Sequence, residues 1–224
     1  AFEKDTGIPV IIDAAGAYGN QAAGHVVDVV FSFHATKSFG AAEGCVMVSP
    51  DPERILHVRR LSNFGLDTRN GELVDLGTNA KMSEYHCAIG LASFDEWVDT
   101  QQARRNLYAR YLAALAYHVS EVTLQAKDLK GVYPVMSVAL PSGIDVETVR
   151  ANLSQAGIET RRWDAPGLDS HPALKRYPSG DLRVSNDIGS RILGLPFFIG
   201  LSDEQISRIC TTLANAIRGP QATP

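Results

Sequence analysis

Short apolar runs alternate along the chain with stretches in which apolar residues recur at helical spacing. Continuous apolar runs at residues 10–12, 29–31 and 46–48 predict three strands in the first half. The helical stretches are expected at residues 51–60, from Ser83 onward, at 100–117, at 145–156 and at 202–218. This alternating order is typical of an α/β protein.

The helix that opens at Ser83 is expected to bury one apolar face. The residues assigned to that face are Cys87, Ile89, Leu91, Phe94 and Trp97. In the second half, strands are expected at 132–140 and at the run that ends in ETRRW (159–163). We therefore predict two domains: residues 1–100, with a mostly parallel sheet, and residues 101–224, a connecting helix followed by a smaller α/β domain.

The composition narrows the class of protein. The 224 residues are 45% hydrophobic and 21% charged, as in ordinary globular proteins. A net charge of -4 without a Lys/Arg cluster argues against nucleic-acid and membrane-surface partners. The three single cysteines predict buried thiols in a reducing compartment and no metal site. With no membrane-length apolar run and no signal peptide at the first residue, we expect a cytoplasmic protein.

A lysine between two predicted strands is the first candidate for chemistry. Lys37 lies in a Ser/His/Thr/Lys cluster that follows the run at 29–31 and precedes the run at 46–48. An amine between buried strands is costly to keep charged, and a readily neutralised amine is what Schiff-base chemistry needs. Alternatively, Lys37 caps a strand end with its ammonium in water, and spacing alone does not choose between the two.

Two polar residues come at the ends of predicted strands. Asp13 follows the run at 10–12, at the sheet edge where ligands of open α/β sheets bind. Its carboxylate has the charge to pair with a protonated ring nitrogen, but the residues alone favour a capping role in the following turn. Ser32 ends the next strand, where its hydroxyl either meets a ligand or satisfies a backbone group.

Two segments carry a family resemblance. The run SFHATK (32–37), followed by Glu43 and Gly44, resembles the SFHxTK…EGG signature of DegT/StrS-type sugar aminotransferases, which have the fold-type I pyridoxal-phosphate architecture. GTNAKMSEYHCAIGLASFDEW (77–97) is similar to the GxNxRMSE…AAxGLxxL segment of that family. Cys45 and Gly16 depart from its pattern.

The resemblance implies a role for each candidate. Lys37 would form the Schiff base with pyridoxal 5'-phosphate and afterwards move the proton between substrate and cofactor, while His34 would have a structural hydrogen-bonding role. Asp13 would pair with the pyridine nitrogen, and Ser32 would meet the phosphate. Further contacts implied for the cofactor are Ala15 against the ring face, and Asn79 and Lys81 reaching across a homodimer interface.

The resemblance also implies substrate contacts in the second half. Arg161, Arg162 and His171 fall in the segment that forms the substrate mouth in relatives, where they would meet a nucleotide diphosphate. For the arginines, a solvated surface is the alternative.

The implied function is transfer of an amino group from an amino acid, with glutamate as the expected donor, to a nucleotide-linked keto sugar. Lys37 disfavours the dehydratase branch of the family, and GTNAKMSEYH disfavours a sulfur amino-acid lyase. The first six residues read as a helix end, and the resemblance begins in the middle of the large domain, so the fold is expected to be partial. The alternative is therefore a non-catalytic remnant or fragment that folds or dimerises without the cofactor.

Overall fold

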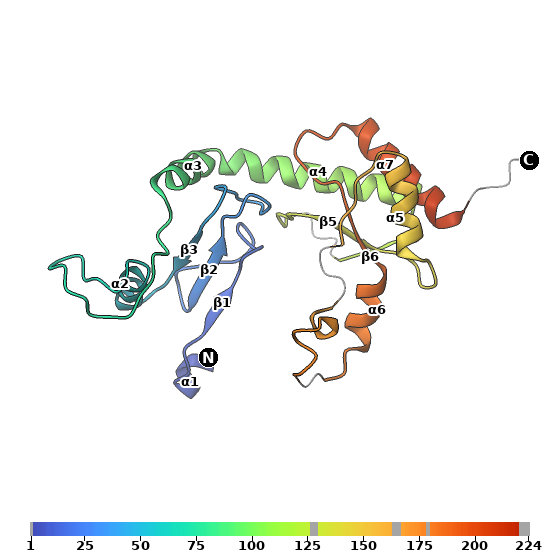
Figure 1. Cartoon of the computed structure of the whole chain (residues 1–224). Helices are drawn as coiled ribbons and strands as arrows, with labels where there is room; N and C mark the ends of the chain where they lie inside the picture. The colour runs from blue at the N-terminus through green and yellow to red at the C-terminus, as the bar shows by residue number, and fades with distance from the viewer. Residues whose placement is uncertain (1, 126–129, 163–166, 178–179, 220–224) are drawn as a thin grey trace, which may run out of the picture. The chain divides into compact units, whose positions relative to one another are not determined.

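The computed structural model describes residues 2–125, 130–162, 167–177 and 180–219. The chain separates into two units, residues 1–102 and 103–224, each with its own three-stranded sheet (Figure 1). The predicted α/β class is confirmed.

The first unit is built on a sheet of order β1-β2-β3. After the short helix α1 (Phe2–Thr6), the chain forms β1 (Ile11–Asp13), β2 (Asp28–Ser32) and β3 (Cys45–Val48). β1 and β2 are parallel, whereas β2 and β3 are antiparallel, so the parallel part of this sheet is one strand pair.

The core of the first unit lies on one face of this sheet. Ala14, Val29 and Phe31 are buried there. Ile11 is 63% exposed, so β1 is covered on only one face among the residues that the structure describes. β1 is the edge strand of this sheet, next to β2.

Two helices of this unit begin after a side chain that caps their first turn. Asp51 accepts an N–H from Glu53 and begins α2 (Pro52–Leu61), and Ser83 accepts one from His86 and begins α3 (Glu84–Asp95). The helix that opens at Ser83 ends earlier than expected, because α3 ends at Asp95 and Trp97 already belongs to the next helix, α4 (Trp97–His118).

The expected buried face of α3 is wrong, apart from Trp97 in α4. Cys87, Ile89, Leu91 and Phe94 are exposed, Leu91 at 69% and Phe94 at 59%. Residues 86, 90, 93 and 97 recur at helical spacing and are the half-buried or buried ones. Gly90 and Ser93 are small and let this face of the helix pack closely against Gly40 and Ala41. The larger apolar residues lie away from this face and are exposed.

The second unit is an antiparallel sheet packed with helices. Its strands are β4 (Thr123–Leu124), β5 (Met136–Ala139) and β6 (Ile192–Leu195), in the order β4-β5-β6. The helices are α5 (Val146–Gln155), capped by Asp145, the 3-10 turn η1 (Leu168–Ser170), α6 (Arg183–Arg191) and α7 (Asp203–Arg218), which begins in a capping box at Ser202.

The core of this unit joins α4, α5 and α7 to the sheet. Its fully buried members include Tyr111, Leu115, Met136, Leu153, Leu193, Ile206 and Leu213. The strand expected over 132–140 is shorter than predicted, and the ETRRW run contributes an isolated bridge between Arg161 and Gly194. Trp163 lies outside the described residues.

The cysteines differ from expectation. Cys45 and Cys87 are exposed, and Cys210 is buried. Burial raises the pKa of the Cys210 thiol to about 12, as for an inert core thiol. Among the residues that the structure describes, no helix has both the length and the apolar character that a membrane crossing requires.

Candidate active site

Asp13 and Ser32 end neighbouring parallel strands. Asp13 is paired with Val30, two residues before Ser32. Because side chains alternate along a strand, Asp13, Val30 and Ser32 lie on one face, whereas Val29 and Phe31 face the core. A carboxylate and a hydroxyl therefore meet at the same edge of the sheet.

The Asp13 side chain has one local partner. Its Oδ1 accepts the N–H of Ala15 at 3.0 Å, the capping contact that the residues alone favour. The carboxylate is exposed, and within the described ranges it contacts no cationic side chain. Capping uses one oxygen and leaves the other for a ligand, so the two interpretations of Asp13 are compatible.

The residues after β2 hold each other in a tight turn. Ser32 Oγ accepts the N–H of His34 at 3.3 Å. His34 Nδ1 lies 2.8 Å from Thr36 Oγ1, and its Nε2 lies 3.4 Å from a Glu43 carboxylate oxygen. His34 thus contacts a residue just before Lys37 and another six residues after it.

Lys37 lies in a closed loop between β2 and β3, which we call the Lys37 loop (residues 33–44). Backbone hydrogen bonds span it from Phe33 to Gly44 and from Ala35 to Ala42, each 2.8 Å long. Ala42 has a φ of 65°, a strained value for a residue with a side chain. The Lys37 side chain is half-buried, and among the described residues its amine has no hydrogen-bond or ion-pair partner.

An aromatic cluster that the sequence analysis missed supports this loop. Its members are Tyr18, Phe31, Phe33, Phe39 and Trp97. The ring centroids of Phe33 and Phe39 lie 4.7 Å apart, and Tyr18 lies 4.5 Å from Phe39. Phe33 and Phe39 flank Lys37 in the sequence, so their contact draws the two sides of the loop together. Their presence on either side of the lysine was the signal available.

Asn79 and Lys81 belong to a second loop, residues 62–82. Lys81 Nζ donates to Asn63 Oδ1 at 2.6 Å and lies 4.8 Å from the centroid of the Phe64 ring. Asn79 forms an isolated bridge with Asn63, and both candidates are exposed. Lys81 therefore pairs within its own loop.

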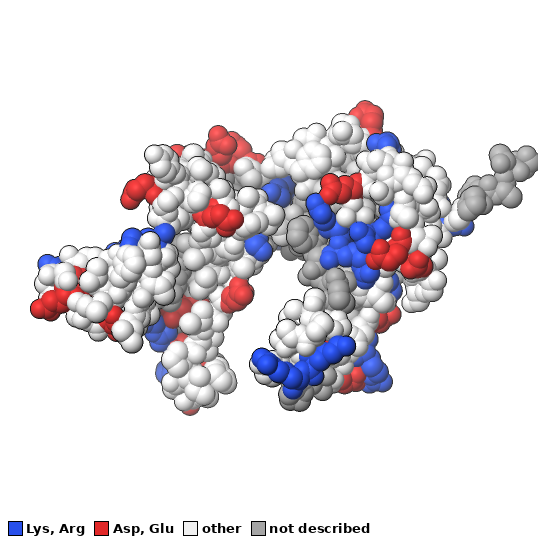
Figure 2. Space-filling view, in the orientation of Figure 1, with Lys and Arg blue, Asp and Glu red and all other residues white. Residues whose placement is uncertain are grey.

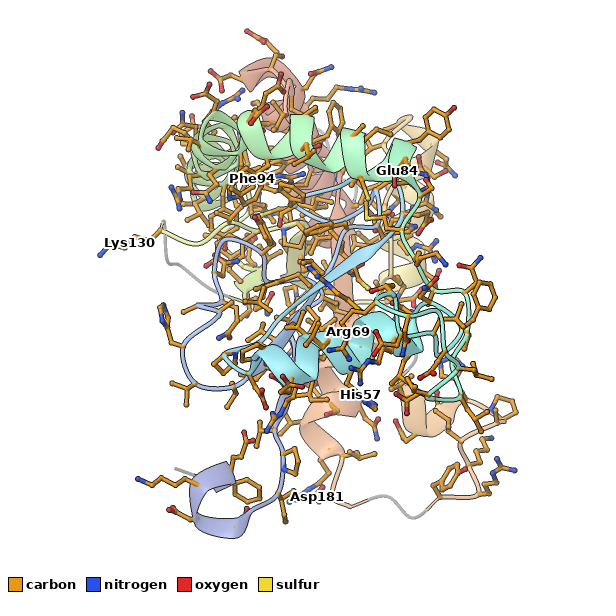
Figure 3. The ribbon with its side chains drawn as sticks, turned by 90° about the vertical axis from the view of Figure 1, so that its left-hand side faces the viewer. His57, Arg69, Glu84, Phe94, Lys130 and Asp181 are labelled. Atoms are coloured by element: carbon orange, nitrogen blue, oxygen red, sulfur yellow. The ribbon has the colours of Figure 1, made fainter. Side chains whose placement is uncertain are left out.

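The same loop is fastened by Asp67, which the sequence analysis did not single out. Arg69 donates to both oxygens of the buried Asp67 carboxylate, at 3.0 and 2.6 Å. These hydrogen bonds hold the pKa of Asp67 well below its ordinary value. Arg69 and His57 are labelled in Figure 3.

The substrate candidates belong to the second unit. Arg161 pairs with Glu159 at 2.5 Å, and Arg162 pairs with Glu147 at 2.9 Å. His171 is exposed at the end of η1. Figure 2 shows basic and acidic side chains next to one another on the side of the second unit that it draws. The two arginines are thus neutralised by neighbouring glutamates, as on a solvated surface.

A sequence model of the DegT/DnrJ/EryC1/StrS aminotransferase family matches residues 1–214. The chain belongs to this family. Protein Rv3402c of Mycobacterium tuberculosis is 30% identical over 95% of this chain and 53% of its own length. The chain therefore spans about half the length of the curated relatives it matches.

Solved structures of the family share the fold. A Bacillus cereus protein assigned as a PLP-dependent aminotransferase is 31% identical, with a TM-score of 0.85 over 95% of this chain and 60% of that one. DesI, solved in the presence of its TDP-sugar product, is 30% identical, with a TM-score of 0.82 over 97% of this chain and 58% of that one. The expected family and the partial fold-type I architecture are both confirmed.

Proposed function

We propose that this chain is part of a pyridoxal-phosphate-dependent aminotransferase that moves an amino group from an amino acid, expected to be glutamate, to a nucleotide-linked keto sugar. The single observation that carries the proposal is the family match, which includes the segment holding Lys37. Because the chain spans about half of its relatives, the activity of the whole protein is part of the proposal.

The residues at the sheet edge fit pyridoxal phosphate chemically. The cofactor needs an amine for its aldehyde, a carboxylate for its ring nitrogen and donors for its phosphate. Lys37 is half-buried and its amine has no partner among the described residues, Asp13 has one carboxylate oxygen that the Ala15 N–H does not use, and Ser32 has a hydroxyl. Ala15 is the small residue beside Asp13 that would contact the ring.

Each candidate residue would have a separate chemical role. When bound, the cofactor supplies an electron-withdrawing ring that stabilises negative charge at the substrate carbon. The Asp13 carboxylate would keep the ring nitrogen protonated. The Lys37 amine would move the proton between the substrate carbon and the cofactor carbon. The Ser32 hydroxyl would donate a hydrogen bond to the phosphate.

The nucleotide part of the substrate is proposed to contact Arg161, Arg162 and His171. DesI was solved with a TDP-sugar, which carries the diphosphate that such cations recognise. Arg161 is better placed than Arg162 because it is exposed and the glutamate with which it pairs, Glu159, is exposed as well. Arg162 also donates to the Gly189 carbonyl, so it is held in the fold.

We propose a homodimer in which Asn79 and Lys81 approach the partner's cofactor. Both residues are exposed on a loop whose backbone is tied at its base. The exposed apolar residues of α3 offer the contact area. In this proposal residues 1–100 belong to the cofactor-binding domain and residues 101–224 to the connecting helix and the small domain.

A fragment that does not bind the cofactor is the second candidate. Two observations favour it: the chain matches only about half the length of its relatives, and Ile11 on the edge strand β1 is exposed. A phosphate site usually includes a helix N-terminus, and neither Asp13 nor Ser32 lies at one.

Trapping distinguishes the two candidates. The purified protein is incubated with pyridoxal phosphate, reduced with borohydride and mapped by mass spectrometry. The proposal expects the cofactor on Lys37, and no label in Lys37→Ala. Lys175→Ala, a matched change of an exposed lysine in the second unit, should label as the wild type does. Wild-type protein that gains no label on Lys37 at any cofactor concentration would establish the non-binding fragment.

A further inference from the structure

Helix α3 contacts the Lys37 loop through a serine. Ser93 Oγ donates a hydrogen bond to the backbone carbonyl of Gly40 at 3.0 Å, across 53 positions of sequence. Gly40 comes three residues after Lys37. Glu84 and Phe94, labelled in Figure 3, mark the length of the helix that carries Ser93.

The same face of α3 meets the next residue of the loop. A side chain added at Gly90 would have its Cβ 3.4 Å from the Cβ of Ala41, which is ordinary contact distance. Gly90 and Ser93 are three positions apart and therefore share a helix face. Two successive loop residues, Gly40 and Ala41, thus rest on two small residues of one helix.

The loop residues that α3 touches lie on the buried side of the loop. Ser38, Phe39 and Ala41 are buried, with exposed fractions of 4%, 3% and 0%. Ala35 and Thr36, on the other side of Lys37, are exposed. Lys37 therefore stands at the boundary between an exposed tip and a buried base, and its position follows from how firmly that base is held.

The Ser93 hydroxyl brings the loop a hydrogen-bond donor from outside the loop. The backbone bonds inside the loop join Phe33, Ala35 and Ala41 to other loop residues, whereas Ser93 brings a donor from a separate helix. A carbonyl in a part-buried place that loses its donor is costly. Without the hydroxyl, the loop would gain conformations in which the Gly40 carbonyl turns toward water.

We propose that Ser93 is a positioning residue for Lys37, and that its hydrogen bond to Gly40 keeps the Lys37 amine in the one place where an aldehyde cofactor can reach it. This inference rests on the proposed function. A loop that populates the competent conformation only part of the time binds its ligand more weakly by that fraction. Loss of the bond therefore weakens attachment of the cofactor without removing any group that touches it.

The test compares four proteins: wild type, Ser93→Ala, Ser93→Thr and Ser62→Ala. Ser62 is the matched control, since its hydroxyl also donates to a backbone carbonyl, that of Arg59 at 3.1 Å, away from the Lys37 loop. Half-saturation of borohydride-trapped pyridoxal phosphate on Lys37 is measured for each, together with the thermal melting curve. We expect about a fivefold higher half-saturation in Ser93→Ala, the change that one hydrogen bond gives. Ser93→Thr should restore the wild-type value, and Ser62→Ala should match it.

A second readout does not need the cofactor. Reductive methylation with formaldehyde and cyanoborohydride reports the accessibility of each lysine amine. In Ser93→Ala, methylation of Lys37 is expected to be severalfold faster than in wild type, with that of the exposed Lys175 unchanged.

The two readouts separate the inference from the function on which it rests. If wild type gains no trapped pyridoxal phosphate but Ser93→Ala still speeds up methylation of Lys37, the proposed function is overturned and the positioning role stands. Ser93→Ala that equals wild type in both readouts would overturn the positioning role, as would a Ser93→Ala defect that threonine does not rescue.

Discussion

Asp13 and Ser32 stand at the ends of adjacent parallel strands and point to the same face of the sheet, because Asp13 is in register with Val30 and Ser32 follows two residues later. The face opposite them carries the buried Val29 and Phe31. The strand pairing thus separates the two functions of this sheet: one face makes the core, and the other presents polar groups at the edge.

The charge of Asp13 is predicted to matter more for the cofactor than for the fold. Asp13→Asn keeps an oxygen for the N–H of Ala15 but removes the negative charge. A hydrogen bond to a charged group contributes about 1.5–3 kcal/mol, so cofactor half-saturation should rise about tenfold or more, with the melting temperature unchanged. Asp13→Ala, which also loses the turn contact, should lower the melting temperature. Equal cofactor binding by Asp13→Asn and wild type would exclude the pairing with the ring nitrogen.

The aromatic support of the Lys37 loop is predicted to be a main source of stability in the first unit. Phe39 is 3% exposed and contacts Tyr18, Phe33 and Trp97. Phe39→Ala should lower the free energy of unfolding by about 3–5 kcal/mol, as is usual for a buried phenylalanine. The control is Phe198→Ala in the second unit, where the side chain is 55% exposed and the change should stay within about 0.5 kcal/mol. Urea unfolding measures both, and similar values for the two variants would contradict the burial of Phe39.

Features that depend on neighbouring residues could be predicted from the sequence. Asp51, Ser83, Asp145 and Ser202 each cap the helix expected after them, because a cap needs only its own side chain and the next three N–H groups. The strand ends at Asp13 and Ser32 follow from short apolar runs in the same way.

Features that depend on residues far apart in the sequence could not be predicted from it. The apolar residues of α3 predicted its buried face, but the helix packs through Gly90 and Ser93, since the loop beneath it comes too close for large side chains. The helix α6 and the strand β6 were missed because Arg183–Arg191 is polar and Ile192–Leu195 is a strand only through its pairing with β5. Whether Lys37 and the five other cofactor candidates act as proposed stays a prediction.

The loop at residues 62–82 is predicted to loosen in acid. Hydrogen bonds from Arg69 lower the pKa of Asp67 in the folded state, so the carboxylate stabilises the loop at every pH above the unfolded value of about 4. This contribution declines as the pH falls from about 4 toward the folded pKa. Amide exchange of Phe64, whose N–H donates to Thr78 at 3.0 Å, should therefore speed up there beyond its intrinsic pH dependence. Asp67→Asn should exchange faster at neutral pH and lose this acid response; a response that persists in that variant would refute the role of Asp67.

The exposed stripe of α3 is predicted to be the contact between two copies of the chain. Cys87, Leu91 and Phe94 recur at helical spacing and are all exposed, although apolar side chains at such spacing usually face a packed surface. Leu91→Asp places a charge in the middle of this stripe, and burying an unpaired charge is costly, so the variant should sediment as a monomer at concentrations where the wild type is a dimer. The control, Leu168→Asp, alters an equally exposed leucine of the second unit, at 74%, and should leave the dimer intact. A wild type that sediments as a monomer at all concentrations would refute the homodimer, and a dimer that survives Leu91→Asp would place the contact elsewhere.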